Sequence, residues 1–121
     1  MRRLPAILAL LAGLLGAFGV GGAAAAAHGA FPPNLLTAST FMLFHAGPVL
    51  AISRFAGNSR LWLACGALLA VGALLFGGEL AIGALIGASP LPLAAPTGGW
   101  AMILGWLGVS AAGCHELLAR K

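Results

Sequence analysis

The stretch from Leu61 to Ala88, LWLACGALLAVGALLFGGELAIGALIGA, decides the fold, because Glu79 is its only charged residue. A helix needs about 20 mostly apolar residues to cross roughly 30 Å of bilayer hydrocarbon, and this stretch exceeds that length. Three further apolar runs surround it, each bounded by charged residues, prolines or polar clusters. The pattern predicts an all-α integral membrane protein, a four-helix transmembrane bundle with spans at residues 4–27, 36–52, 61–88 and 96–118.

The overall composition favours the same class. Of the 121 residues, 61% are apolar and 7% are charged, whereas a soluble domain carries about 25% charged residues. The net charge is +4, but the basic residues sit at the chain ends and around one loop, so they form no face for nucleic acid phosphates. Helices and short loops account for the whole chain, which predicts a single membrane domain over residues 1–121 and no nucleic acid partner.

The positions of the basic residues predict the orientation, because Lys and Arg in short loops stay on the cytoplasmic side. These residues are Arg2, Arg3, Arg54, Arg60, Arg120 and Lys121. Four spans place all of them on one side and the two loops without Lys or Arg on the other. We therefore expect both termini to be cytoplasmic.

The first span has a second interpretation. Arg2 and Arg3, the apolar run and the alanines at 23–27 also resemble a cleavable secretory signal. The run from Leu4 is longer than a usual signal core, and its glycines at 13, 16 and 19 are typical of helix packing, so we expect a retained helix. The other three spans keep their orientation under either interpretation.

Small residues that recur four positions apart predict close helix contacts, because apolar burial does not drive helices together in lipid. The chain contains 19 glycines. The recurring pairs are Ala12 with Gly16, Gly13 with Ala17, Gly83 with Gly87, and Ala101 with Gly105.

His45 and Glu79 are the polar candidates inside the membrane, where such side chains are costly. With a rise of about 1.5 Å per residue, His45 lies about 14 Å from the edge at Arg54 and Glu79 about 28 Å from the edge at Arg60. The two are therefore not expected to pair. His45 is either a proton carrier or metal or haem ligand, or a neutral imidazole that donates to a neighbouring helix, which we favour. Glu79 is either an interfacial carboxylate near water or His28, or part of an ion or proton path.

Aromatic and sulfur-containing residues supply weaker candidates. Trp62 and Trp100 lie near opposite edges, where indole anchors are expected, whereas Trp106 is deeper and predicted to pack. Cys65, Cys114 and His115 form a weak candidate metal site, but no CxxC spacing supports it. We expect both cysteines to be buried as small apolar residues, with no metal and no cofactor bound.

The sequence contains no nucleophile motif, P-loop, dinucleotide fingerprint or HExxH motif. Bis-histidine haem is also disfavoured, since His28 and His115 belong to opposite edges of the membrane. We therefore expect that the protein is not an enzyme.

Several segments resemble one small family of membrane proteins. They are residues 16–19 (GAFG), 44–46 (FHA), 75–80 (LFGGEL), 96–99 (PTGG) and 105–106 (GW). In this order they are similar to the domain of unknown function 423 family, four-helix bacterial inner-membrane proteins related to eukaryotic transmembrane protein 256. The chain departs from that pattern at Gly21, where the family has a histidine, and at residues 76–81, where two serines are absent.

This resemblance implies a multi-pass protein of the bacterial inner (cytoplasmic) membrane, but it supplies no activity. Small size, short loops and sparse chemistry favour a structural or accessory subunit of a larger membrane complex. The alternative is a small oligomeric transporter or proton-coupled carrier that uses Glu79 and His45. The expected partners are the lipid bilayer and other membrane subunits or further copies of the chain.

Overall fold

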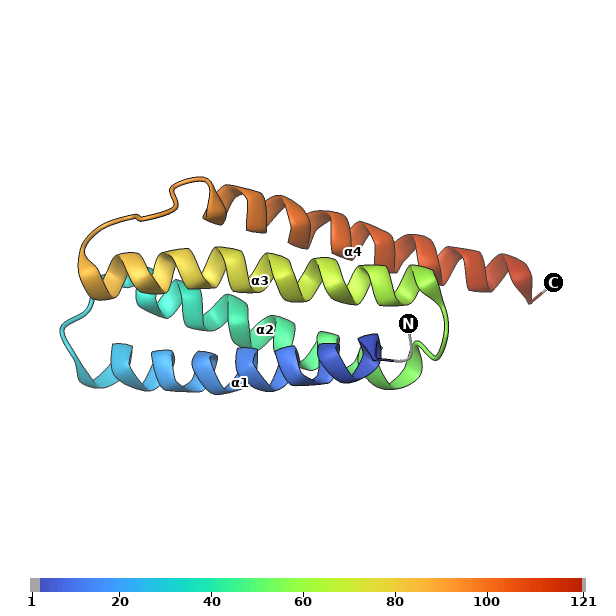
Figure 1. Ribbon diagram of the computed structural model, residues 1–121, viewed down its shortest axis with the longest axis horizontal. Helices are drawn as coiled ribbons and strands as arrows, with labels where there is room; N and C mark the ends of the chain where they lie inside the picture. The colour runs from blue at the N-terminus through green and yellow to red at the C-terminus, as the bar shows by residue number, and fades with distance from the viewer. Residues whose placement is uncertain (1–2, 121) are drawn as a thin grey trace.

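The computed structural model describes residues 3–120, so Arg2 and Lys121 lie outside the described residues. Four helices follow one another: α1 (Leu4–His28), α2 (Pro33–Phe55), α3 (Arg60–Ile86) and α4 (Ala94–Ala119). Each is long and apolar enough to cross a membrane. The chain runs up and down, so that α1 begins at the same end of the bundle at which α4 ends (Figure 1). The predicted all-α four-helix class is confirmed, and the chain is a multi-pass membrane protein.

The boundaries of α2 differ from the prediction at both ends. The helix begins at Pro33 rather than at residue 36 and continues to Phe55 rather than to residue 52. Proline is tolerated in the first turn because the N–H that it lacks would have no partner within the helix. Arg54, which was expected to follow the helix, therefore lies in its last turn.

Local signals explain both ends of α3. The Ser59 side chain accepts a hydrogen bond from the backbone N–H of Trp62 at 3.4 Å, which caps the first turn. Gly87 ends the helix with φ of 71°, a left-handed conformation that favours glycine because it has no Cβ. Helix α4 then begins at Ala94, two residues before the predicted start.

The bundle is open on one side. The backbones of α1, α2 and α3 lie close to one another, whereas the backbone of α4 lies close to that of α3 alone. Figure 1 shows α4 along α3, on the side away from α1. Because the backbone of α4 has one close neighbour, the α3–α4 interface does most to fix its position.

The α3–α4 interface is a backbone contact between two glycines. A Cβ added to Gly98 would lie 2.6 Å from the carbonyl oxygen of Gly72 and 2.6 Å from the backbone nitrogen of Phe76. Gly98, Gly105 and Ala112 are all buried and follow one another at intervals of seven residues. This spacing keeps one side of α4 against α3. Only residues without a side chain permit an approach this close.

Some of the small residues predicted to pack, in the recurring pairs or among the glycines of the first span, lie at helix contacts, and others do not. Gly105 packs on Leu69, and Gly19 packs on Leu43. In contrast, a Cβ on Gly13 would meet nothing within 4 Å, and Gly87 caps α3 rather than packing against a helix. Small residues occur on every face of helices this rich in Ala and Gly, so their spacing alone does not identify the contact face.

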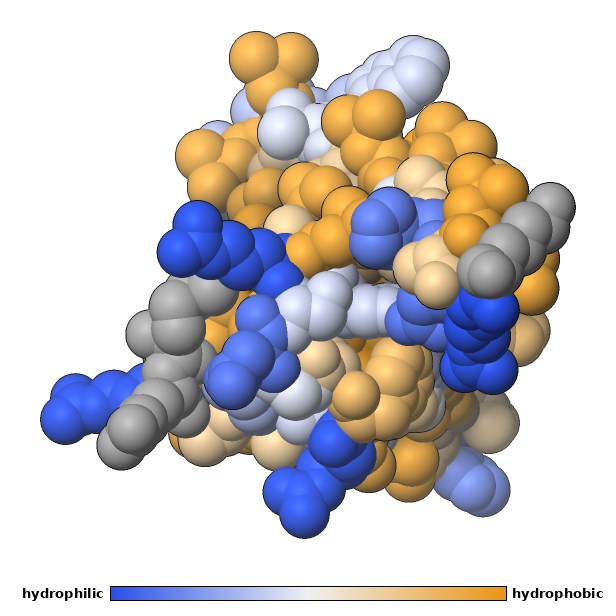
Figure 2. Space-filling view, turned by 90° about the vertical axis from the view of Figure 1, so that its right-hand side faces the viewer, coloured by the Kyte–Doolittle hydropathy of each residue, from blue (hydrophilic) through white to orange (hydrophobic). Residues whose placement is uncertain are grey.

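The basic residues within the described range gather at one end of the bundle. Arg3, Arg54, Arg60 and Arg120 are exposed at the start of α1, the end of α2, the start of α3 and the end of α4. Figure 2 looks onto this end and shows strongly hydrophilic side chains around its edge. We call it the basic end, and the end with the α1–α2 and α3–α4 loops the opposite end.

The glycine contact predicts a sharp difference between neighbouring substitutions. Gly98→Ala should lower the free energy of unfolding by about 1–3 kcal/mol, because the new methyl group meets backbone atoms that cannot move aside. Gly99→Ala is the matched control, since its Cβ would lie 4.0 Å from the Phe76 ring in ordinary contact. Thermal unfolding in mild detergent measures both. Equal stability of the two variants would contradict the proposed backbone contact.

Candidate functional site

His45 is buried in α2 with both ring nitrogens occupied. Nδ1 lies 2.7 Å from the carbonyl oxygen of Phe41, and Nε2 lies 3.2 Å from the indole nitrogen of Trp106. Because an indole N–H can only donate, Nε2 accepts from Trp106 and Nδ1–H donates to Phe41. This network assigns a neutral imidazole in a single tautomer. His45 therefore donates within its own helix and accepts from α4. This differs from the expected arrangement, in which the imidazole donates to a neighbouring helix.

The Trp106 indole bridges two helices whose backbones do not touch. It reaches from α4 to α2 across a groove that holds a cavity of about 320 Å³. Phe41 and Phe76 pack there with ring centroids 4.7 Å apart. Trp106 was predicted to pack at depth; in the structure its side chain is 43% exposed, and its N–H supplies a hydrogen bond that holds α4 to α2.

Glu79 lies near the opposite end of α3 and is 6% exposed. Its carboxylate accepts hydrogen bonds from the Ser89 hydroxyl and, at 3.3 Å, from the backbone N–H of Leu91. Both donors belong to the loop between α3 and α4. His28 is exposed at the end of α1 and is not one of these donors. The carboxylate therefore ties the loop to the helix that precedes it.

His45 and Glu79 occupy different depths. The ring contact between Phe41 and Phe76 aligns α2 with α3, and from this level His45 lies four residues towards the basic end. Glu79 lies three residues towards the opposite end, which places it about 10 Å from His45 along the helices. The two side chains therefore do not form a pair.

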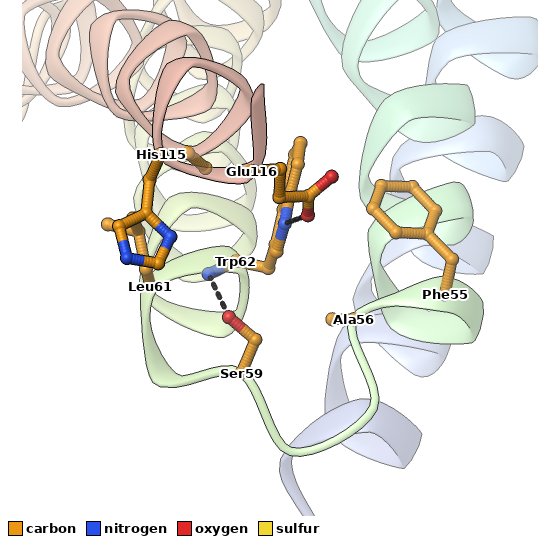
Figure 3. A pocket seen from close by; sticks show the side chains of 8 residues that line it. Phe55, Ala56, Ser59, Leu61, Trp62, His115 and Glu116 are labelled. Atoms are coloured by element: carbon orange, nitrogen blue, oxygen red, sulfur yellow. Dashed lines mark hydrogen bonds between the residues drawn. The ribbon is translucent and has the colours of Figure 1, made fainter. Parts of the chain in front are cut away.

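A second polar bridge joins α3 and α4 at the basic end (Figure 3). Trp62 Nε1 donates to Glu116 Oε1 at 2.7 Å, and the Phe55 ring packs edge-on against Trp62 with centroids 5.0 Å apart. The cavity beside them measures about 310 Å³ and also contacts His115. Trp62 was expected to be an interfacial anchor, but its N–H is used within the chain. Trp100 is 66% exposed and has the exposure expected of an anchor.

The two cysteines lie in different surroundings. Cys65 is buried at the α3–α4 interface, where its sulfur would be 2.7 Å from a Cβ on Gly108. Cys114 is exposed, so the expectation that both thiols are buried is wrong for this residue. Its side of α4 faces away from α3. Across residues 3–120, no three His, Cys, Asp or Glu side chains gather closely enough to hold a metal ion, Cys65, Cys114 and His115 included.

Comparison with known families adds one finding. The family model described as "Protein of unknown function (DUF423)" matches residues 15–99. The chain belongs to the DUF423 family. The matched segment contains His45 and Glu79, but it ends before Trp106 and Glu116 on α4. No curated protein and no solved structure matches the chain. Membership in DUF423 thus establishes the relationship and leaves the activity open.

The sequence identified His45 and Glu79 as polar groups but missed their partners. Trp106, Ser89 and the Leu91 N–H come from parts of the chain 61, 10 and 12 residues away, respectively. A useful signal was available for Trp106, because an indole N–H at membrane depth usually requires an acceptor. The sequence does not predict the relative register of α2 and α4 that brings His45 within reach of this N–H.

The His45–Trp106 bridge predicts a double-mutant cycle. Trp106→Phe should destabilise the fold by about 1 kcal/mol, because it leaves the buried His45 Nε2 without a donor. In a His45→Phe background the same change should be nearly neutral. Trp100→Phe on the exposed face is the control for losing an indole. Chemical unfolding in detergent gives the four free energies, and simple additivity would argue against the bridge.

Proposed function

We propose that this DUF423 protein is a non-catalytic structural or accessory subunit of a larger complex in the bacterial inner membrane. The observation that carries the proposal is that no buried side-chain polar atom within residues 3–120 is without a hydrogen-bond partner. His45 and Glu79 both hold parts of the chain together. A carrier or catalytic group has to exchange partners with a proton or substrate, whereas these groups are committed to internal bonds.

The open side of the bundle supports association with other membrane helices. The backbone of α4 lies close to that of one helix, and large apolar side chains are exposed on its other faces. Trp100 is 66% exposed and Leu107 is 61% exposed. Such faces can meet lipid, other subunits or further copies of this chain. The short loops leave little material for a function outside the membrane, which also favours partners within it.

The basic end supports an orientation with both termini in the cytoplasm. The four described arginines all lie at this end, and the loops at the opposite end contain no Lys or Arg. Since Lys and Arg in short loops stay on the cytoplasmic side, we propose that the α1–α2 and α3–α4 loops lie on the other face of the membrane.

The proposal predicts partners in fixed ratio. A chain with a C-terminal fluorescent protein, extracted from its native membrane in mild detergent, should isolate with defined membrane subunits in intact-complex mass spectrometry. The tag should also be fluorescent in cells, because the chosen fluorescent protein matures only in the cytoplasm. A tagged membrane protein of similar size and four spans controls for non-specific recovery. A chain that runs alone in several detergents would contradict the subunit role.

The alternative is a small oligomeric transporter or proton-coupled carrier, and a single observation favours it. Glu79 is a buried carboxylate within a helix of membrane-span character, and intramembrane carboxylates commonly serve ion or proton passage. Four helices from one chain enclose little space, so a substrate path would need several copies.

Two substitutions at the same hydrogen bond distinguish these roles. If Glu79 only tethers the loop, Glu79→Gln and Ser89→Ala should both make the α3–α4 loop more susceptible to proteolysis and have similar effects. If Glu79 carries protons, Glu79→Gln should abolish proton-driven uptake in vesicles, whereas Ser89→Ala should preserve it. Proteolysis and uptake measured on the same vesicles separate the outcomes. Uptake by the wild type that is insensitive to Glu79→Gln would remove the support for the carrier.

A further inference from the structure

A crevice opens between α1, α2 and α3 in the half of the bundle away from the basic end. Its cavity measures about 500 Å³. Phe18 and Gly21 contribute from α1, Leu35 and Met42 from α2, and Gly78 and Leu85 from α3. None of the polar bridges described above reaches it, so this space is separate from the candidate site.

The crevice exists because α1 and α3 pack together near the basic end, whereas in the other half of the bundle their facing sides carry glycines. Near the basic end, Leu8 packs against Gly66, where an added Cβ would lie 3.0 Å from the leucine side chain. In the other half, Cβ atoms on Gly21 and Gly78 would meet nothing within 4 Å. The missing side chains leave the space open on both walls.

The lining excludes a polar occupant. Ser39 is the one hydroxyl-bearing residue among those that line the cavity, and its hydroxyl donates to the Leu35 carbonyl at 2.8 Å. The remaining lining residues are apolar or glycine. All three helices have membrane-span character, so the crevice lies at the depth of bilayer hydrocarbon. Its occupant must therefore be hydrocarbon or an apolar helix.

The dimensions favour a hydrocarbon chain over a helix. The residues that line the crevice on α3 run from Leu74 to Leu85, a rise of about 16 Å, or half of a hydrocarbon core of roughly 30 Å. A helix about 10 Å wide occupies about 420 Å³ per turn of about 5.4 Å, so nearly three turns would be needed over that length. The cavity has room for about one such turn. A single acyl chain is much narrower and spans one leaflet.

We infer that this crevice binds one acyl chain of a phospholipid from the leaflet at the opposite end of the bundle. The chain lies along the groove between α1 and α3 with α2 beneath it, and the headgroup sits level with the ends of these helices. The inference is independent of the accessory role, because it rests on a different face of the molecule from the polar bridges.

Leucine substitutions at the open glycines test this inference. Protein reconstituted in dioleoylphosphatidylethanolamine vesicles and released into mild detergent should carry one phospholipid in native mass spectrometry. Gly78→Leu and Gly21→Leu fill the crevice from opposite walls without meeting backbone. Each should lower the retained lipid about tenfold, the loss expected when about two methylene groups lose buried contact. Gly13→Leu is the matched control, because Gly13 also faces open space but does not line the crevice.

Each other outcome contradicts the inference. Wild-type protein without bound lipid, equal loss of lipid in Gly13→Leu, or unchanged binding in both crevice variants would overturn it. Recovery of a second copy of the chain, in place of lipid, would identify a helix as the occupant. Circular dichroism checks that each variant folds, and Gly78→Ala and Gly21→Ala provide smaller versions of the test, with weaker losses expected.

Discussion

The contact between the backbones of α3 and α4 at Gly72 and Gly98 is the constraint on which the arrangement of this protein depends. Within a bilayer, helices gain little from hiding apolar surface from one another, and close approach through small residues supplies much of their attraction. Because the backbone of α4 approaches only that of α3, this crossing sets its register and height. The side chains that α4 presents to the rest of the bundle follow from that register.

Three polar bridges use this register at successive depths. Glu79 holds the α3–α4 loop at one end, the Trp106 indole meets His45 in the middle, and Glu116 accepts from Trp62 at the basic end. The bridges of His45 and Glu79 satisfy buried groups that would be costly if left unpaired in hydrocarbon, whereas the Trp62–Glu116 bridge is exposed at the basic end. Together they give the few polar residues of the chain a structural use, which is why we favour a subunit over a carrier.

Glycine has two opposite effects in the same molecule. At Gly72 and Gly98 the missing side chain lets two backbones touch, whereas at Gly21 and Gly78 it leaves space that no side chain among residues 3–120 fills. The difference comes from the direction each position faces within the bundle. One face of α3 therefore holds α4 tightly, and another face forms one wall of a crevice suited to a lipid chain.

The sequence alone determined the class, the number of helices and their approximate limits, because apolar runs of membrane length are readable residue by residue. The boundary errors at α2 arose because Pro33 can begin a helix and Arg54 can lie in its last turn. The sequence also identified His45 and Glu79, since any polar group at membrane depth stands out in such a chain.

Only the tertiary structure decided which residues meet. Glycines of similar spacing had different roles, and Gly13, which looked like a packing position, faces open space. Trp106 and Glu116 became bridging residues because the crossing at Gly98 turns them towards α2 and α3, respectively. Contacts between helices depend on rotation and vertical register. Local hydrophobicity encodes neither the rotation of a helix nor its vertical register. The hydrogen-bond partners of the polar residues therefore follow only from the tertiary structure.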